Sequence, residues 1–199
     1  ITGQFEARVN AFFKKHNMNC VLGYGWGCTE NATSAAMRTL PETVMIGSVG
    51  APQVNTIVSV FDPETGKELT YGQEGELCIH SHTLMMGYYQ SADTSKQVMK
   101  AHEDGLVWLH TGDLGAIDDE GFLYITGRKK DLIITAGGKN VSPAPMENTI
   151  CECPIVAHAV VVGDNKPFIG ALVTLDPDMT PSWLKEQGLD PDLPMEDAA

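Results

Sequence analysis

The hydrophobic pattern of the first 45 residues predicts one helix and one strand. Apolar side chains recur at the three- and four-residue spacing of an amphipathic helix from Phe5 to Phe13, and we expect that helix to end near Asn17. The apolar run 20–27 predicts a short strand that enters a glycine-rich turn. Residues 1–45 are therefore expected to form a helix and strand of an α/β layer, with no partner strands inside this chain.

From residue 46 onward the pattern becomes that of β-strands. The runs 53–62 and 75–80 are rich in β-branched residues, and the Pro, Asp and Gly of a reverse turn lie between them. A short helix is expected over 92–105, followed by more strand pattern and a hairpin. Residues 46–129 are thus predicted to form a mostly antiparallel β-rich subdomain.

After the basic run Arg128–Lys130, predicted strands and helices alternate. The expected strands are 131–138, 157–164 and 168–176, and the expected helices are a proline-initiated one over 142–153 and a short one around Trp183. We expect residues 130–199 to be a small α+β domain that is incomplete, because it ends in a run of Pro and Asp without a closing element. The predicted fold class is therefore α/β together with α+β.

Composition and charge narrow the class of protein. With 43% hydrophobic and 20% charged residues, the chain has the composition of a globular protein. Its 26 acidic and 13 basic residues give a net charge of -13, which repels a phosphate backbone and excludes nucleic acid as the expected partner. No apolar run approaches the roughly 18 to 20 residues that span a bilayer, and no signal-peptide pattern opens the chain, so we expect a cytoplasmic protein.

The five cysteines are odd in number and scattered, which predicts reduced thiols rather than a disulfide framework. Strand alternation places Cys78, His80 and His82 on one face, and we expect that face to be solvent-exposed rather than to bind a metal. Further along, Trp108 is expected to pack in the interior and His110 to face solvent.

One short stretch, residues 110–131, combines glycines, carboxylates and an Arg-Lys-Lys run. Within it, Asp113 lies in a glycine-rich turn where a ligand can approach the backbone closely. The two oxygens of a carboxylate are suited to the two hydroxyls of a ribose. By itself, however, the same turn is equally consistent with an Asp in an ordinary polar loop.

The order of several motifs removes this ambiguity. The sequences GYGWGCTE, GELCIHSHTLMMGYY, HTGDLG, GRKKD and TAGGKN follow one another between about residues 20 and 170. This succession resembles the adenylate-forming superfamily, which includes acyl-CoA synthetases, luciferases and peptide-synthetase adenylation domains. The stretches 135–148 and 166–178 look most like those of a long-chain fatty-acid CoA ligase. The resemblance implies the β-rich end of a large N-terminal domain joined by a hinge to a small α+β C-terminal domain.

The resemblance implies a two-step reaction. A carboxylate attacks the α-phosphate of ATP to give an acyl-adenylate and pyrophosphate, and the thiol of coenzyme A then displaces AMP. In the element WGCTE, Trp26 would stack on adenine, Thr29 would bond the α-phosphate and Glu30 would hold Mg²⁺. The doubled GYGWG leaves Tyr24, beside Gly25, as an alternative stacking ring.

Six further residues acquire roles through the same resemblance. Asp113 matches the ribose-binding carboxylate, Arg128 matches an arginine that reaches the nucleotide, and Lys130 matches the hinge between the domains. The loop TAGGKN would line the tunnel for coenzyme A, with Gly137 and Gly138 beside the pantetheine chain and Lys139 near a phosphate of the cofactor.

The resemblance also implies that parts of the machinery lie outside this chain. The family's phosphate loop is expected upstream of Ile1, its adenylation lysine beyond Ala199, and most of the acid-binding pocket upstream as well. We therefore expect an inactive portion of a fatty-acid CoA ligase. Two alternatives stay open: a ligase for aryl or amino acids, and a non-catalytic nucleotide-binding or interaction module. Oligomeric state and membrane contact by a longer parent also stay open.

Overall fold

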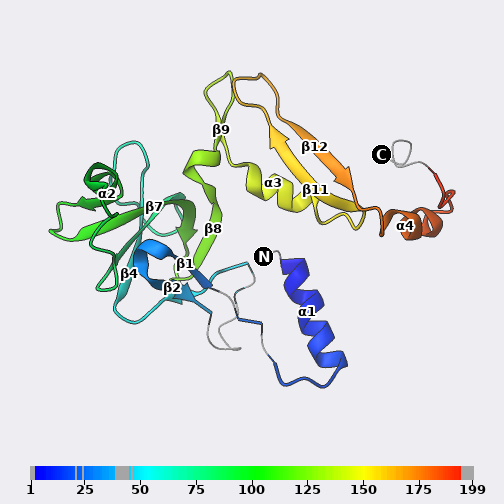
Figure 1. The fold of residues 1–199 in the computed structure, drawn as a ribbon, viewed down its shortest axis with the longest axis horizontal. Coiled ribbons are helices and arrows are strands. Elements are labelled where there is room, and N and C mark those ends of the chain that lie inside the picture. The colour runs from blue at the N-terminus through cyan, green and yellow to red at the C-terminus, as the bar shows by residue number, and fades with distance from the viewer. Residues whose placement is uncertain (1–2, 21, 24, 39–44, 46, 194–199) are drawn as a thin grey trace. The chain divides into compact units, whose positions relative to one another are not determined.

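The computed structural model describes residues 3–20, 22, 23, 25–38, 45 and 47–193 (Figure 1). The chain divides into two compact units, residues 1–130 and residues 131–199, which we call the first and the second unit. The mixed α/β content, rich in strands, confirms the predicted fold class.

The N-terminal helix α1 spans Gly3–Lys15, as the hydrophobic spacing predicted. Two lysines occupy its last turn, where positive charge complements the helix dipole. The chain then turns at Asn17, whose φ is 53°. The buried carboxylate of Glu6 pairs with the buried guanidinium of Arg38, so the helix is tied to the residue that follows strand β2.

A small antiparallel sheet follows the helix. Its strands, in spatial order, are β1 (Gly25–Cys28), β2 (Thr33–Met37) and β3 (Ala51–Pro52), and the short 3-10 helix η1 (Thr29–Asn31) joins the first two. The prediction that this piece has no partner strands in the chain is wrong. Strand β2 was missed because it is rich in alanine and serine, and its small, fully buried Ala35 and Ala36 lie on the strand that pairs with β1.

The larger sheet of the first unit has five antiparallel strands, as the alternating pattern predicted (Figure 1). Four strands run in the order β4, β5, β7, β6, and β8 pairs with the far end of β7. The bounds are β4 Thr56–Phe61, β5 Gly75–Ser81, β6 Met99–Ala101, β7 Val107–Ile117 and β8 Leu123–Arg128. The predicted helix 92–105 is shorter in the structure, because α2 covers Ala92–Val98 and the chain then enters β6.

Strand β5 is paired on both edges, by β4 and by β7, and its side chains are buried on both faces. Leu77 and Ile79 point into the main core, and Cys78 points into a second cluster with Phe61 and Trp108. Burying each large apolar side chain contributes roughly 1.5 to 3 kcal/mol. The expectation of a solvent-exposed Cys78 is therefore wrong, since its exposure is 0%, whereas the prediction that Trp108 packs inside is confirmed.

Residues 131–193 of the second unit form two hairpins and two helices. After η3 (Lys129–Asp131), its elements are β9 (Ile133–Ile134), β10 (Asn140–Val141), α3 (Pro143–Ile150), β11 (Val156–Val162), β12 (Gly170–Leu175) and α4 (Thr180–Glu186). Helix α3 begins with Pro143, which fits a first helical turn. The predicted strand 131–138 shortens to two residues, because the rest forms the turn of the β9–β10 hairpin.

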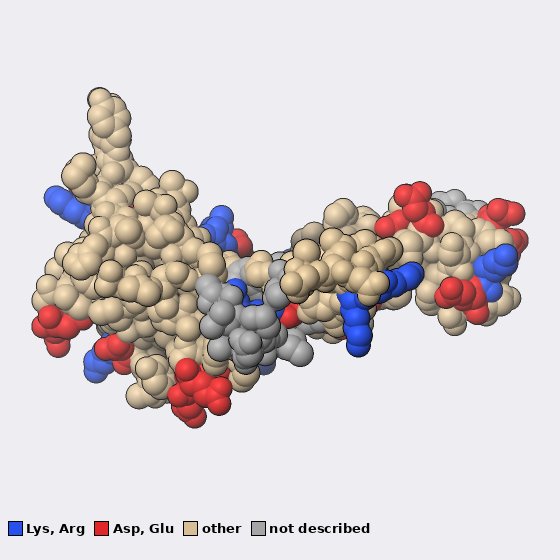
Figure 2. Space-filling view, turned by 90° about the horizontal axis from the view of Figure 1, so that it is seen from below, with Lys and Arg blue, Asp and Glu red and all other residues tan. Residues whose placement is uncertain are grey.

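Charged side chains of both signs lie on the surface. On the face that Figure 2 shows, Lys and Arg side chains are scattered between acidic and uncharged ones and form no continuous basic surface. Among the described residues, no helix has both the length and the apolar content needed to cross a bilayer.

Candidate functional site

The central feature of the site is a bulge in β7 at Thr111–Asp113. Three residues of β5, from Glu76 to Cys78, face five residues of β7, from Leu114 to His110, so β7 carries two extra residues there. The bulge is fixed by the Thr111 hydroxyl, which donates to the Leu77 carbonyl at 2.6 Å and accepts from the Asp113 N–H at 3.1 Å. Gly112 has a φ of 74°, a conformation that few other residues adopt.

Asp113 is held by one donor at each carboxylate oxygen. Arg128 Nε donates to Oδ1 at 2.6 Å, and Trp26 Nε1 donates to Oδ2 at 2.8 Å. Asp113 and Arg128 are direct partners across β7 and β8, so the strand register itself brings them together. An ionised carboxylate has about four lone-pair sites, and two therefore remain for hydroxyl groups of a ligand.

Trp26 is placed by strand β1. Its side chain is only 8% exposed and packs into the main core, and the exposed remainder lines a shallow recess with Thr29. Neighbouring Gly25 packs against β2, where a Cβ would lie 2.5 Å from the Ala36 carbonyl oxygen. The alternative stacking ring, Tyr24, lies outside the described residues.

Glu30 lies in η1, one residue after the exposed Thr29. Tyr88 donates its hydroxyl to Glu30 Oε1 at 2.6 Å, and this hydrogen bond is the main reason that the pKa of Glu30 is lowered. The positive charge of Arg128 lowers the pKa of Glu30 further, so the Glu30 carboxylate lies within the electrostatic reach of the Asp113–Arg128 pair. The same hydrogen bond raises the pKa of Tyr88 to about 12. An ionised, half-buried carboxylate of this kind fits Mg²⁺, which prefers hard oxygen ligands.

Two residues that contact this site were missed from the sequence, Tyr88 and Glu76. Both lie in the motif GELCIHSHTLMMGYY, which was recognised only as part of the motif order. Glu76 accepts a hydrogen bond from the N–H of Gly112 and another from a ring nitrogen of His110, each at 3.1 Å. His110 was expected to face solvent, and this is wrong, because its side chain is only 8% exposed. His110 is the register partner of Cys78, and Glu76 lies two residues before Cys78 on the same face of β5.

The predicted hinge lies at the end of the first unit. Lys130 is exposed, and the unit boundary falls between Lys130 and Asp131. A shallow recess of about 340 Å³ is lined by residues of the bulge and of this segment, namely Thr111, Gly112, Arg128, Lys129 and Lys130. The hinge segment therefore borders the turn that carries Asp113.

The glycine loop of the second unit is the turn of the β9–β10 hairpin. Thr135 closes it, since its N–H donates to the Lys139 carbonyl and its hydroxyl accepts the Lys139 N–H, both at 3.1 Å. Gly138 has a φ of 76°, and Gly137, Gly138 and Lys139 are all exposed. The loop is thus a compact exposed turn in which both glycines are open to a ligand.

Two family profiles match this chain. The profile of the family described as AMP-binding enzyme matches residues 3–89, and that of the AMP-binding enzyme C-terminal domain matches residues 130–189. Among solved structures, the O-succinylbenzoate coenzyme A synthetase MenE of Bacillus subtilis, in complex with ATP and magnesium ion, is 30% identical with a TM-score of 0.66. That match covers 77% of this chain and 31% of MenE.

Two curated relatives carry the name long-chain-fatty-acid–CoA ligase. FadD15 of Mycobacterium tuberculosis is 38% identical over 177 residues, which cover 89% of this chain and 26% of the relative. ACSBG1 of Rattus norvegicus is 48% identical over 178 residues, which cover 88% of this chain and 23% of the relative. The chain therefore spans about a quarter of the length of the curated relatives it matches.

Together, the two domain profiles, the relatives and the structural neighbours define the class of protein. The chain belongs to the adenylate-forming family of AMP-binding enzymes. Its relatives in that family include long-chain fatty-acid CoA ligases.

Proposed function

We propose that this chain is the part of an ATP-dependent fatty-acid CoA ligase that holds the adenosine half of the nucleotide. The observation that carries the proposal is the set of contacts around Asp113. Its carboxylate is fixed by Arg128 and Trp26 and keeps free lone pairs, and the ionised Glu30 lies within the reach of the same arginine. A ribose, a phosphate group and a hard cation all find complementary groups within this cluster.

The proposed roles follow the chemistry of each side chain. Asp113 accepts the ribose hydroxyls, Arg128 orients Asp113 and reaches the nucleotide, and Trp26 contributes its ring to the adenine pocket. Thr29 donates its hydroxyl to the α-phosphate, and Glu30 holds Mg²⁺. A Mg²⁺ ion held there would neutralise phosphate charge and so favour attack by the substrate carboxylate.

The transfer of the acyl group to coenzyme A is proposed to involve the hinge and the second unit. We propose that Lys130 is the point about which residues 131–199 rotate between acyl-adenylate formation and transfer to coenzyme A. Support comes from its exposure and from the unit boundary beside it. Gly137, Gly138 and Lys139 are proposed to contact coenzyme A, because they form an exposed turn with open space around both glycines.

A fatty acid is the proposed acid substrate, on the strength of the names that the relatives carry. The test uses the gene product that contains this chain. ATP–pyrophosphate exchange is measured with dodecanoate, hexadecanoate, benzoate and phenylalanine, and thioester formation with coenzyme A is followed by mass spectrometry. Exchange and thioester formation with the fatty acids are expected.

Other outcomes separate the alternatives. Exchange with benzoate or phenylalanine alone would replace the fatty acid by an aryl or amino acid. Nucleotide binding without exchange for any acid would support the non-catalytic module. The 199-residue chain alone is expected to give no exchange, because the proposed function assigns it only one side of the nucleotide site.

A further inference from the structure

The bulge in β7 leaves backbone groups without their usual partners. Thr111, Gly112 and Asp113 have no paired residue on β5, so their N–H groups must find acceptors outside the regular ladder. The Gly112 N–H donates to Glu76 Oε1 at 3.1 Å. The side chain of Glu76 thus takes the place of a missing strand carbonyl.

The other oxygen of Glu76 holds two further donors. His110 Nδ1 lies 3.1 Å from Oε2, and Lys129 Nζ lies 3.4 Å from the same atom. Glu76 is only 5% exposed. Burial alone would raise its pKa, but the hydrogen bond from His110 and the charge of Lys129, together with Gly112, hold the pKa at about 2. Glu76 is therefore a buried, ionised and fully hydrogen-bonded carboxylate.

Two of the donors to Glu76 are sequence neighbours of the Asp113–Arg128 ion pair. Gly112 directly precedes Asp113, and Lys129 directly follows Arg128. Glu76 therefore holds a neighbour of each member of the ion pair, one on β7 and one just after β8. A shift of Glu76 would move the turn that carries Asp113 and would release the residue next to Arg128.

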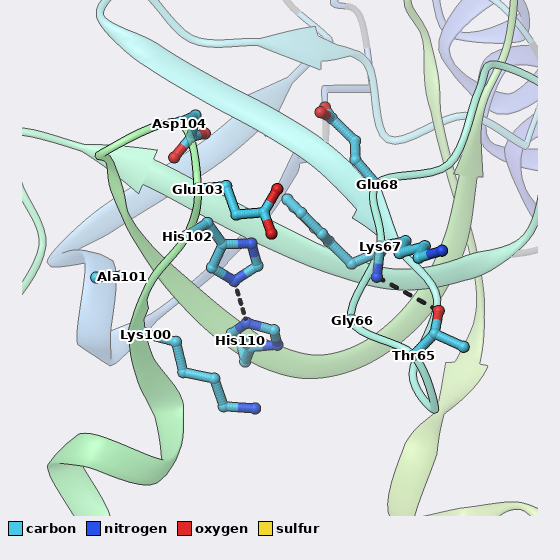
Figure 3. A pocket seen from close by; sticks show the side chains of 11 residues that line it. Thr65, Gly66, Lys67, Glu68, Lys100, Ala101, His102, Glu103, Asp104 and His110 are labelled. Carbon is cyan, nitrogen blue, oxygen red and sulfur yellow. Dashed lines mark hydrogen bonds between the residues drawn. The ribbon is translucent and has the colours of Figure 1, made fainter.

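The network continues into a pocket on the same sheet. His110 Nε2 lies 3.0 Å from His102 Nε2, and the two rings face each other across the pocket wall, as Figure 3 shows. His110 therefore contacts Glu76 with one ring nitrogen and His102 with the other. The contact with His102 fixes the orientation of the His110 ring and so stabilises the hydrogen bond between His110 and Glu76.

We propose that Glu76 is a positioning residue that holds Asp113 and Arg128 in the geometry in which they bind a nucleotide, without touching the nucleotide itself. The proposal rests on the proposed function, since it assumes that this pair is the ribose site. Glu76, Cys78 and His110 also have ligand atoms within 4.8 Å of one another, the donor set of a zinc site. The ammonium of Lys129 on the same carboxylate opposes a cation there, so the carboxylate acts as a hydrogen-bond acceptor.

The test compares Glu76→Gln, Glu76→Asp and Glu76→Ala in the 199-residue chain, with Glu152→Gln as the control. Glu152 is an exposed acid in the second unit. Backbone amide resonances are recorded without ligand, AMP affinity is measured by titration, and the folded fraction is measured by circular dichroism. Glu76→Gln keeps the size of the side chain and loses its charge, and Glu76→Asp keeps the charge on a shorter side chain.

The expected result is that Glu76→Gln stays folded, shifts the amide resonances of Gly112, Asp113 and Arg128, and weakens AMP binding about 10-fold or more. The AMP affinity of Glu76→Asp is expected to lie between those of Glu76→Gln and the unchanged chain. Glu152→Gln is expected to change neither the AMP affinity nor the resonances of Gly112, Asp113 and Arg128. Unchanged AMP affinity in folded Glu76→Gln would overturn the proposal. If Glu76→Ala does not fold, the Gln and Asp variants decide.

The two proposals fail in different ways. Absence of AMP binding by the unchanged chain would count against the proposed function. The ligand-free resonances test the positioning role by themselves, because unchanged Gly112 and Asp113 signals in Glu76→Gln would show that Glu76 does not hold the turn.

Discussion

The guanidinium Nε of Arg128 lies 2.6 Å from Oδ1 of Asp113, and these two residues are direct partners across strands β7 and β8. The pairing is thus set by strand register and does not depend on a ligand. Trp26 fixes the second oxygen of the same carboxylate from a different sheet. A site whose acceptor is already oriented loses little conformational freedom when a ligand binds, which favours affinity.

The close packing of β1 on β2 predicts that Gly25→Ala destabilises the chain. The new Cβ would lie 2.5 Å from the Ala36 carbonyl oxygen, so the strand that carries Trp26 must shift. We expect a loss of about 1 to 3 kcal/mol in the free energy of unfolding, measured by urea denaturation. Gly137→Ala is the control, because its Cβ meets nothing within 4 Å, and a change below about 1 kcal/mol is expected. Equal stability of both variants would contradict this packing.

The sequence predicted most elements but not how one strand pairs. The helix from Phe5 to Phe13 and the antiparallel strands after residue 46 have strong periodicity, and the structure contains them. Strand β2 was missed because alanine and serine carry almost no β signal. The close contact depends on the glycines of β1, since a Cβ on Gly25 or Gly27 would lie 2.5 Å from a carbonyl oxygen of β2, and this is seen only when both strands are viewed together.

The candidate site was predictable only in part, because some of its contacts depend on strand pairing. Trp26, Glu30, Asp113 and Arg128 could be selected because the order of motifs resembles a known family, and the structure brings three of them together by hydrogen bonds. Glu76 gave no such signal. Its role depends on a bulge in β7, and the register of a strand is not readable from alternation alone.

The hydrogen bond between Tyr88 and Glu30 predicts a pH-dependent effect of Tyr88→Phe. The pKa of Glu30 is lowered in the folded chain, so the stabilisation is present above the ordinary carboxyl value of 4.5 and is lost as pH falls through the folded pKa. Removing the hydroxyl is expected to cost about 1 to 2 kcal/mol at pH 7 and less at pH 3.5.

Urea denaturation at both pH values measures this difference. Tyr89→Phe is the control, because Tyr89 is 90% exposed and lies next to Tyr88. The same cost at pH 7 and pH 3.5 would show that the Tyr88 hydroxyl does not stabilise the ionised form of Glu30.

The burial of Cys78 predicts three classes of thiol. Cys20, Cys151 and Cys153 are exposed, Cys28 is half-buried with a pKa raised by burial, and Cys78 is fully buried with its pKa raised for the same reason. Because the thiolate is the reactive form, iodoacetamide at pH 8 should label the three exposed thiols first, Cys28 more slowly, and Cys78 only after denaturation. Peptide mass spectrometry reads the order. Native labelling of Cys78 at the rate of Cys151 would contradict the core described for β5.

The environment of Glu76 predicts how stability depends on acid. Its pKa of about 2 lies below the ordinary value of 4.5, so its stabilisation is fully present above pH 4.5 and is lost as pH falls toward 2. Glu76→Gln lacks this dependence. The difference in unfolding free energy between the unchanged chain and Glu76→Gln should be about 2 to 3 kcal/mol at pH 6 and should shrink by pH 3. A difference that does not vary with pH would mean that Glu76 is not held as an anion.

The central claim is that Asp113 forms part of a nucleotide site, and the most direct measurement is an AMP titration of the chain and of Asp113→Asn by nuclear magnetic resonance. Asn keeps the size of the side chain but loses its charge. We predict saturable shifts at Asp113, Arg128 and Glu30 in the unchanged chain, and about 10- to 100-fold weaker binding in folded Asp113→Asn. Equal affinity in the two chains, or shifts confined to other residues, would contradict the account.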